Sequence, residues 1–125
     1  MSHPKFSVAF EIAGRDKDRT EAFALYQQAF GARKVSAFSP SGPDAENLHI
    51  IMKISSFEIL LHPCKEKRPA GAVNCQLHFD HEHEVRTAYN ALIQGGRDYS
   101  IGSYPHAPVS ALVTDKYGVS WWLHT

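Results

Sequence analysis

The side chains best suited to binding a ligand lie at alternate positions of one short segment. Asn74, Gln76 and His78 alternate with the apolar side chains of the segment 73–79. In a β-strand, successive side chains point to opposite faces, so the three polar groups share one face. Two amides and an imidazole can bind a polar molecule, and His78 can serve as a general base. The outer face of a sheet is also polar without any ligand, so this stripe alone is only a candidate site.

Two adjacent tryptophans near the C-terminus form a second candidate. In the stretch DKYGVSWW, Asp115 and Gly118 have the spacing of a turn that leads into a strand. Adjacent strand residues face opposite sides, so one indole packs in the core and the other faces a pocket. Tyr104 and His106, in the segment SYPHAP, are expected to form the rim of that pocket.

The periodicity of apolar residues predicts two runs of elements, each in the order β-α-β-β-β. The first run has a strand over 6–12, a helix capped by Asp18 and ended by Gly31, and strands over 34–38, 48–54 and 57–62. The second has a strand over 73–79, a helix capped by Asp80 and ended by Gly95 and Gly96, and strands over 97–104, 109–114 and 119–124.

The two runs repeat one another at an almost constant spacing. Glu21 and Tyr26 recur 63 residues later, and the segment LLH at 60–62 recurs 62 residues later as WLH. This repetition favours a duplicated module. We therefore expect a single domain over 1–125, with module one over 1–62, a linker over 63–71 and module two over 72–125.

Composition excludes several classes of protein. The 125 residues include 13 Lys and Arg against 13 Asp and Glu, with no basic block, so nucleic acid is not an expected partner. No apolar run is long enough to span a bilayer, and the N-terminus lacks the pattern of a signal peptide, so no membrane partner and a cytoplasmic location are expected. The two cysteines are expected to be reduced thiols.

Three further segments carry a recognisable pattern: EAFALYQQAFGA at 21–32, LHIIMKISSFEILLH at 48–62 and LVTDKYGVSWWLH at 112–124. They resemble the vicinal oxygen chelate superfamily, which includes glyoxalases, bleomycin-resistance proteins and extradiol dioxygenases, and the last segment is typical of the PhnB-like branch. The resemblance implies an α+β fold in which two βαβββ modules form a concave, half-barrel-like mixed sheet with the helices outside. It also implies a homodimer and a functional site in the concavity.

Catalytic members of this superfamily hold a divalent metal with side chains from the first, fourth, fifth and eighth strands. The corresponding positions here are Ser7 or Glu11, then Leu60, Asn74 and Trp122. Leucine has no donor atom, and an indole cannot replace a carboxylate, so the usual ligand set is incomplete. We therefore expect no cofactor and a protein that binds a small molecule. The expected ligand-binding residues are Asn74, Gln76, His78, Trp122, Glu11, Leu60 and Tyr104.

Two alternatives remain open. A displaced metal site built from Glu58, His62 and His78, with or without Glu11, would favour a lyase, isomerase or dioxygenase, or the chain could be a dimeric scaffold with an incidental cleft. The cluster DHEHE at 80–84 is better explained as a helix cap with acidic charge at the positive end of the helix. No glycine-rich nucleotide loop follows the first strand, so the methyltransferase label attached to some PhnB-like proteins finds no support.

Overall fold

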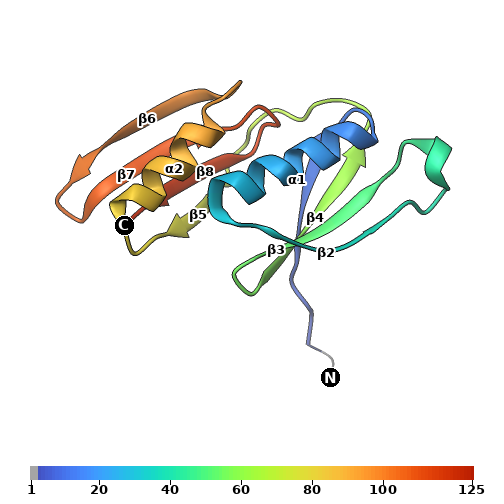
Figure 1. Ribbon diagram of the computed structural model, residues 1–125, viewed down its shortest axis with the longest axis horizontal. Coiled ribbons are helices and arrows are strands. Elements are labelled where there is room, and N and C mark those ends of the chain that lie inside the picture. The colour runs from blue at the N-terminus through green and yellow to red at the C-terminus, as the bar shows by residue number, and fades with distance from the viewer. Residues whose placement is uncertain (1–2) are drawn as a thin grey trace.

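The computed structural model describes residues 3–125, which form two βαβββ modules (Figure 1). Module one contains β1 (Val8–Ala13), α1 (Asp16–Phe30), β2 (Arg33–Phe38), the short 3-10 helix η1 (Pro43–Ala45), β3 (His49–Ile54) and β4 (Phe57–Cys64). Module two contains β5 (Cys75–His78), α2 (Glu82–Leu92), β6 (Arg97–Tyr104), β7 (Ala107–Thr114) and β8 (Ser120–His124). The predicted α+β class and the order of elements are confirmed.

Each module builds its own four-stranded sheet. The strand orders are β1-β4-β3-β2 and β5-β8-β7-β6, with β1 parallel to β4, β5 parallel to β8 and the other pairs antiparallel. The helices α1 and α2 lie side by side and cover the same side of the two sheets (Figure 1). We call the opposite, helix-free side of each sheet its open face. The expected mixed sheet is thus two open sheets, and no hydrogen-bonded strand pair joins them within the described residues.

The strand register repeats from module to module. Leu60 on β4 lies between Ala9 of β1 and Ile51 of β3. Trp122 on β8, 62 residues later, lies in the same way between Gln76 of β5 and Leu112 of β7. The sequence offset therefore corresponds to equivalent places in the two sheets.

An aromatic cluster joins the two modules beneath the helices. The ring of Trp121 lies 5.7 Å from Phe10 on β1, 5.5 Å from Tyr26 and 4.9 Å from Phe30, both on α1. Only 1% of the Trp121 surface is exposed. Since Trp121 belongs to module two and its ring partners to module one, burial of this indole stabilises both modules together.

A buried carboxylate connects the same elements through hydrogen bonds. Asp115, which is fully buried, accepts bonds from the Tyr26 hydroxyl at 2.7 Å and from the Trp121 indole at 2.9 Å. It also accepts backbone N–H bonds from Tyr117 and Val119, at 2.9 and 3.1 Å. We call these contacts the Asp115 network. Burial, with the nearby Asp115 charge, raises the pKa of Tyr26 well above its ordinary value, so the hydroxyl keeps its proton as a donor.

The helix starts differ from the sequence prediction. Helix α1 begins at Asp16 with Arg15 as the N-cap residue, and Asp18 occupies the third helical position, where its carboxylate accepts the Arg15 N–H at 2.8 Å. Asp18 therefore supports the helix start from inside, as the acidic partner of a capping box does. At α2 the N-cap residue is His81 rather than Asp80. Glu82 and Glu84 do place acidic charge in the first turn, as the sequence predicts.

The first turn of α1 is held by a buried arginine that the sequence pattern does not reveal. Arg19 donates to the carbonyl oxygens of Ile12, Gly14 and Glu46, at 3.0, 3.2 and 2.8 Å. These bonds fix the helix to the end of β1 and to the loop that follows η1.

In the described part of the chain, no helix is long and apolar enough to cross a bilayer.

Candidate functional site

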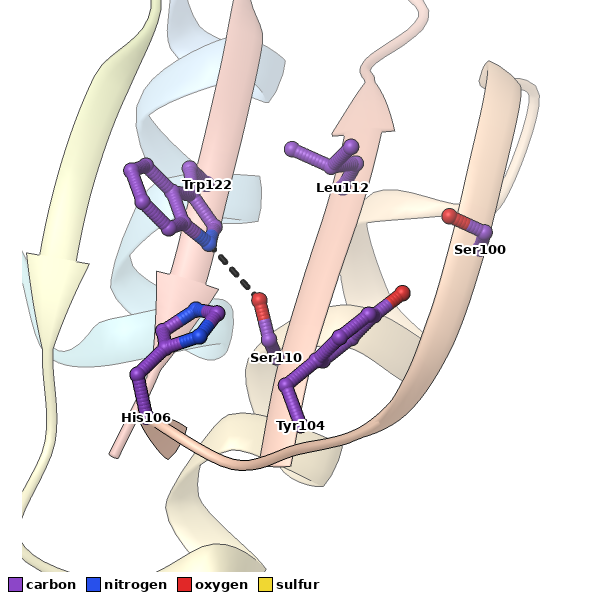
Figure 2. Close-up of a pocket in the computed structure, with 6 residues that line it drawn as sticks. All are labelled: Ser100, Tyr104, His106, Ser110, Leu112 and Trp122. Carbon is purple, nitrogen blue, oxygen red and sulfur yellow. Dashed lines mark hydrogen bonds between the residues drawn. The ribbon is translucent and has the colours of Figure 1, made fainter. Parts of the chain in front are cut away.

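A recess with three aromatic rings lies on the open face of the second sheet. Its volume is about 360 Å³, and Figure 2 shows the side chains that line it. It is lined by Ser100 and Tyr104 from β6, His106 from the β6–β7 turn, Ser110 and Leu112 from β7, and Trp122 from β8. We call it the Trp122 recess. Tyr104 and His106 lie at its edge with Trp122, which is the arrangement that the sequence predicts for these three residues.

The indole of Trp122 is held in a fixed orientation. Its Nε1–H donates to the Ser110 hydroxyl at 2.7 Å (Figure 2). Because its polar group already has a partner within the protein, the ring can offer its apolar surface to a ligand. Leu112, directly opposite Trp122 on the neighbouring strand, is 46% exposed. A large aliphatic side chain left in solvent beside an indole is typical of an apolar binding surface.

The adjacent tryptophans take opposite sides of β8, as strand alternation predicts. Trp121 points into the core and Trp122 to the open face. Further along this face, the His124 ring lies 4.9 Å from Trp122 and 5.4 Å from His78. His78 is thus connected to the Trp122 recess through His124, which the sequence analysis did not single out. The alternation of Trp122 and His124 on one strand was the signal that could have identified it.

The rest of the predicted ligand-binding set is spread over other surfaces. Asn74 and Gln76 line a separate recess of about 340 Å³ between β5 and the β3–β4 hairpin, where Phe57 is also exposed. Cys75, between them, points towards the core, and burial raises the pKa of its thiol, so it is a poor nucleophile. Leu60 and Glu11 belong to the first sheet. The structure therefore brings Tyr104 and Trp122 into one recess but not the whole set.

A hydrogen-bonded pair of titratable groups lies on the open face of the first sheet. Nδ1 of His62 on β4 lies 2.9 Å from Oε2 of Glu11, its register partner on β1. The His49 ring on β3 packs edge-on against the His62 ring, with centroids 4.9 Å apart. Sequence reasoning listed Glu11 as a ligand-binding residue, and Glu11 and His62 as possible metal ligands. It did not predict that the two side chains pair, because their contact depends on the parallel β1–β4 register.

The side chains that the resemblance places at the superfamily's metal positions do not supply a ligand set for a divalent metal. Leu60 offers no donor atom, and the Trp122 Nε1–H is committed to Ser110. For the displaced alternative, Glu58 and His62 are four residues apart on β4, about 13 Å in a regular strand, and His78 lies in the second sheet. Among residues 3–125, no group of three His, Cys, Asp or Glu side chains is positioned to hold a metal.

Comparisons with known proteins give structural rather than sequence matches. No protein-family model matches the chain, and no curated protein sequence matches it. The fold is similar to that of the PhnB protein of Bacillus cereus, with 25% identity, a TM-score of 0.79 and coverage of 97% of this chain and 98% of that one. A Pseudomonas aeruginosa protein is also similar, with 22% identity, a TM-score of 0.75 and coverage of 96% and 97%.

The fosfomycin resistance protein FosX of Mesorhizobium loti has the same fold at lower similarity. The two chains are 14% identical, with a TM-score of 0.64, over 100% of this chain and 93% of that one. A FosX from Listeria monocytogenes is described in complex with Mn(II) and sulfate ion. The paired βαβββ modules and these similarities together show that the chain has the fold of the vicinal oxygen chelate superfamily.

Proposed function

We propose that this protein binds a small, planar, partly apolar molecule in the Trp122 recess, without a divalent metal. The observation that carries the proposal is the arrangement of aromatic surfaces around the recess. Trp122, Tyr104 and His106 surround about 360 Å³ of space, and the exposed Leu112 forms part of its wall. A volume of this size matches the lower range of small-molecule pockets, and aromatic walls favour stacking on a flat ligand.

The polar groups of the recess supply directional contacts. The hydroxyl groups of Ser100 and Tyr104 and the His106 imidazole can each donate or accept one hydrogen bond. The expected ligand therefore has one flat apolar part and a few polar substituents at its edge. The resistance proteins of this superfamily that sequester drugs offer a model for such a function.

Tryptophan fluorescence tests the proposal directly. We expect a compound from a library of planar aromatic fragments to change the emission of the protein, and the Trp122→Ala variant to lose that response. Leu60→Ala is the matched control, because Leu60 holds the equivalent position in the first sheet and should leave the response unchanged. The proposal is contradicted if no fragment perturbs the emission, or if the response persists in Trp122→Ala.

Metal analysis separates this proposal from the metal-dependent alternative. We expect protein purified without chelator or affinity tag to contain no stoichiometric metal and to show no tight 1:1 binding when titrated with Mn, Ni, Zn and Fe. Tight binding that is lost in Glu58→Ala or His78→Ala would instead support an enzyme with a displaced metal site.

We further propose that the protein is a homodimer, as the superfamily resemblance implies. Exposed apolar side chains just before β1, at the start of β4 and just before β5 support this assembly, namely Phe6, Phe57 and Val73. Sedimentation velocity should give a particle of twice the 14.0 kDa chain mass. A single species of 14.0 kDa at micromolar concentration would contradict the proposed dimer.

A further inference from the structure

We propose that His124 extends the Trp122 recess and selects ligands whose aromatic ring carries a neutral hydrogen-bond donor, such as a carboxamide, over the corresponding carboxylates. The proposal rests on the proposed function, because it concerns ligands that stack in the same recess. His124 lies two residues beyond Trp122 on β8, on the same open face, and the centroids of the two rings are 4.9 Å apart. A flat molecule that lies on the indole therefore reaches the imidazole with a substituent at its edge.

A contact with the backbone determines the tautomer of His124. Nδ1 of the ring lies 3.4 Å from the backbone oxygen of Thr125, and such an oxygen can only accept a hydrogen bond. Nδ1 must therefore carry the proton of the neutral ring, and Nε2 keeps a lone pair. The ring thus offers an acceptor to a ligand, and its complementary partner is an N–H or O–H group.

A second imidazole borders His124 on the side away from the recess. His78, its register partner on β5, lies with its ring 5.4 Å away and at 72° to the His124 ring. His124 is therefore the middle member of a row of three rings that begins at Trp122. Neighbours on both sides restrict the movement of the imidazole, which lowers the entropy lost when a ligand donates to it.

The lining of the recess favours a neutral ligand. The described side chains that form it belong to two serines, a tyrosine, a histidine, a leucine and a tryptophan, and none of them carries a fixed charge. A carboxylate placed there would lose water without gaining an opposite charge, and one of its oxygens would face the Nε2 lone pair. A primary amide on the same ring is uncharged, donates through its two N–H groups and accepts through its carbonyl oxygen. The recess therefore matches an aromatic carboxamide better than the aromatic acid.

Three benzene derivatives of similar shape separate the effect of charge from that of hydrogen bonding. Benzamide is neutral and donates, methyl benzoate is neutral without an N–H or O–H group, and benzoate is an anion. The Kd of each is measured from the shift of the Trp122 indole N–H signal at pH 8, where an ordinary imidazole is uncharged. We expect benzamide to bind at least ~10-fold more tightly than benzoate, because only the amide can donate to the acceptor of His124.

Variants of His124 test whether its acceptor causes the preference. His124→Phe keeps a ring but removes the acceptor, so the ratio of the methyl benzoate Kd to the benzamide Kd should fall at least ~3-fold, as expected for the loss of one hydrogen bond. His124→Arg presents only donors and a positive charge, and should reverse the preference so that benzoate binds more tightly than benzamide. A gain of benzoate binding cannot arise from a folding defect. His83→Phe, at an exposed histidine on α2, is the control and should leave all three Kd values unchanged.

The possible results distinguish the role of His124 from the proposed function. If the three compounds move the Trp122 signal with equal Kd values, or if the preference for benzamide persists in His124→Phe, the recess binds ligands but the role of His124 is overturned. If none of the three moves the signal, the selection of aromatic carboxamides is overturned, whereas the proposed function is judged by the wider library of planar fragments. Loss of the preference in His124→Phe together with its reversal in His124→Arg is the result that we expect.

Discussion

The two modules share a backbone plan but differ in what they place on their open faces. In the first sheet, the central row holds Glu11, His62 and His49, which are titratable. In the second sheet, the place equivalent to Leu60 holds Trp122, and the surrounding side chains form an aromatic recess. The two modules thus keep the same strand register, because register is fixed by backbone pairing and by the buried face of each sheet. The side chains of the open faces do not affect the register, so they differ between the modules.

The turns between the last two strands of each module differ as well. In module one, β3 and β4 are joined by the two-residue turn Ser55-Ser56. In module two, the longer turn carries Asp115, whose carboxylate reaches α1 of module one through Tyr26. The second turn therefore connects the modules through a buried hydrogen bond, and its loss should be especially damaging.

The largest effect is expected at the core tryptophan of β8. Trp121→Ala should lower the free energy of unfolding by about 3–5 kcal/mol, because it leaves a cavity in the aromatic cluster between the modules. Trp122→Ala, one residue further, should cost at most about 1–2 kcal/mol, since it removes one hydrogen bond and a ring that is only partly buried. Urea unfolding measures both values, and equal losses would contradict the assignment of opposite faces.

The Asp115 network should be the next most sensitive feature. Asp115→Ala is expected to cost about 3 kcal/mol, because it leaves the Tyr26 hydroxyl and the Trp121 indole without their acceptor. Lys53→Ala, on β3 of module one, is the control and should change stability by about 0.5 kcal/mol or less. A loss below about 1 kcal/mol for Asp115→Ala would show that this network does not hold the modules together.

The turn of module two also depends on a glycine. Gly118 has φ of +91°, and an added Cβ would lie 2.9 Å from the Arg68 carbonyl oxygen. We therefore expect Gly118→Ala to cost about 1–3 kcal/mol. Gly71→Ala, in the linker, meets nothing within 4 Å and should be nearly neutral. Thermal unfolding of the two variants provides the comparison, and similar melting temperatures would argue against a strained turn.

The smallest expected effect is a loss of stability at alkaline pH. Burial, then the charges of Glu21, Asp115 and Asp18, raise the pKa of Tyr117 to about 12, and burial raises the pKa of Tyr26 well above its ordinary value. Between pH 10 and 12 the unfolded chain loses these protons and the folded chain keeps them. The unfolded state therefore binds fewer protons there, and the free energy of unfolding should fall as pH rises.

Replacement of both tyrosines tests the origin of this pH dependence. The double variant Tyr26→Phe, Tyr117→Phe should show a shallower decline than the unaltered protein in urea unfolding at pH 9.5 to 11.5. An unchanged slope would mean that other groups cause the alkaline instability.

The sequence was sufficient to predict the order of elements, because the buried faces of the strands and helices carry regular apolar patterns. The alternation in β8 likewise predicted the opposite sides of Trp121 and Trp122. The helix starts were wrong, since capping at Asp18 and Asp80 was judged from residue type, whereas the carboxylate of Asp18 acts from inside the helix. The Asp115 network was not predicted, because Tyr26 and Asp115 lie 89 residues apart and only tertiary packing brings them together.

The candidate sites show the same limit. Tyr104, His106 and Trp122 could be placed together from strand pairing and turn position, which are local properties. The sequence could not predict that Asn74 and Gln76 line a different recess from Trp122, because that depends on how the two sheets are arranged. Likewise, the contact between Glu11 and His62 required the parallel β1–β4 register, and 51 residues separate the two.

The most direct test of the account uses the two indole N–H signals of the protein. In a ¹H–¹⁵N spectrum they are assigned by Trp121→Phe and Trp122→Phe, and the aromatic fragment that most strongly quenches fluorescence is then added. We expect the Trp122 signal to move, because its N–H lies in the recess with Ser110, and the Trp121 signal to stay, because its N–H is buried against Asp115. A shift of the Trp121 signal alone, or of neither signal while residues of the first sheet respond, would contradict ligand binding in the Trp122 recess.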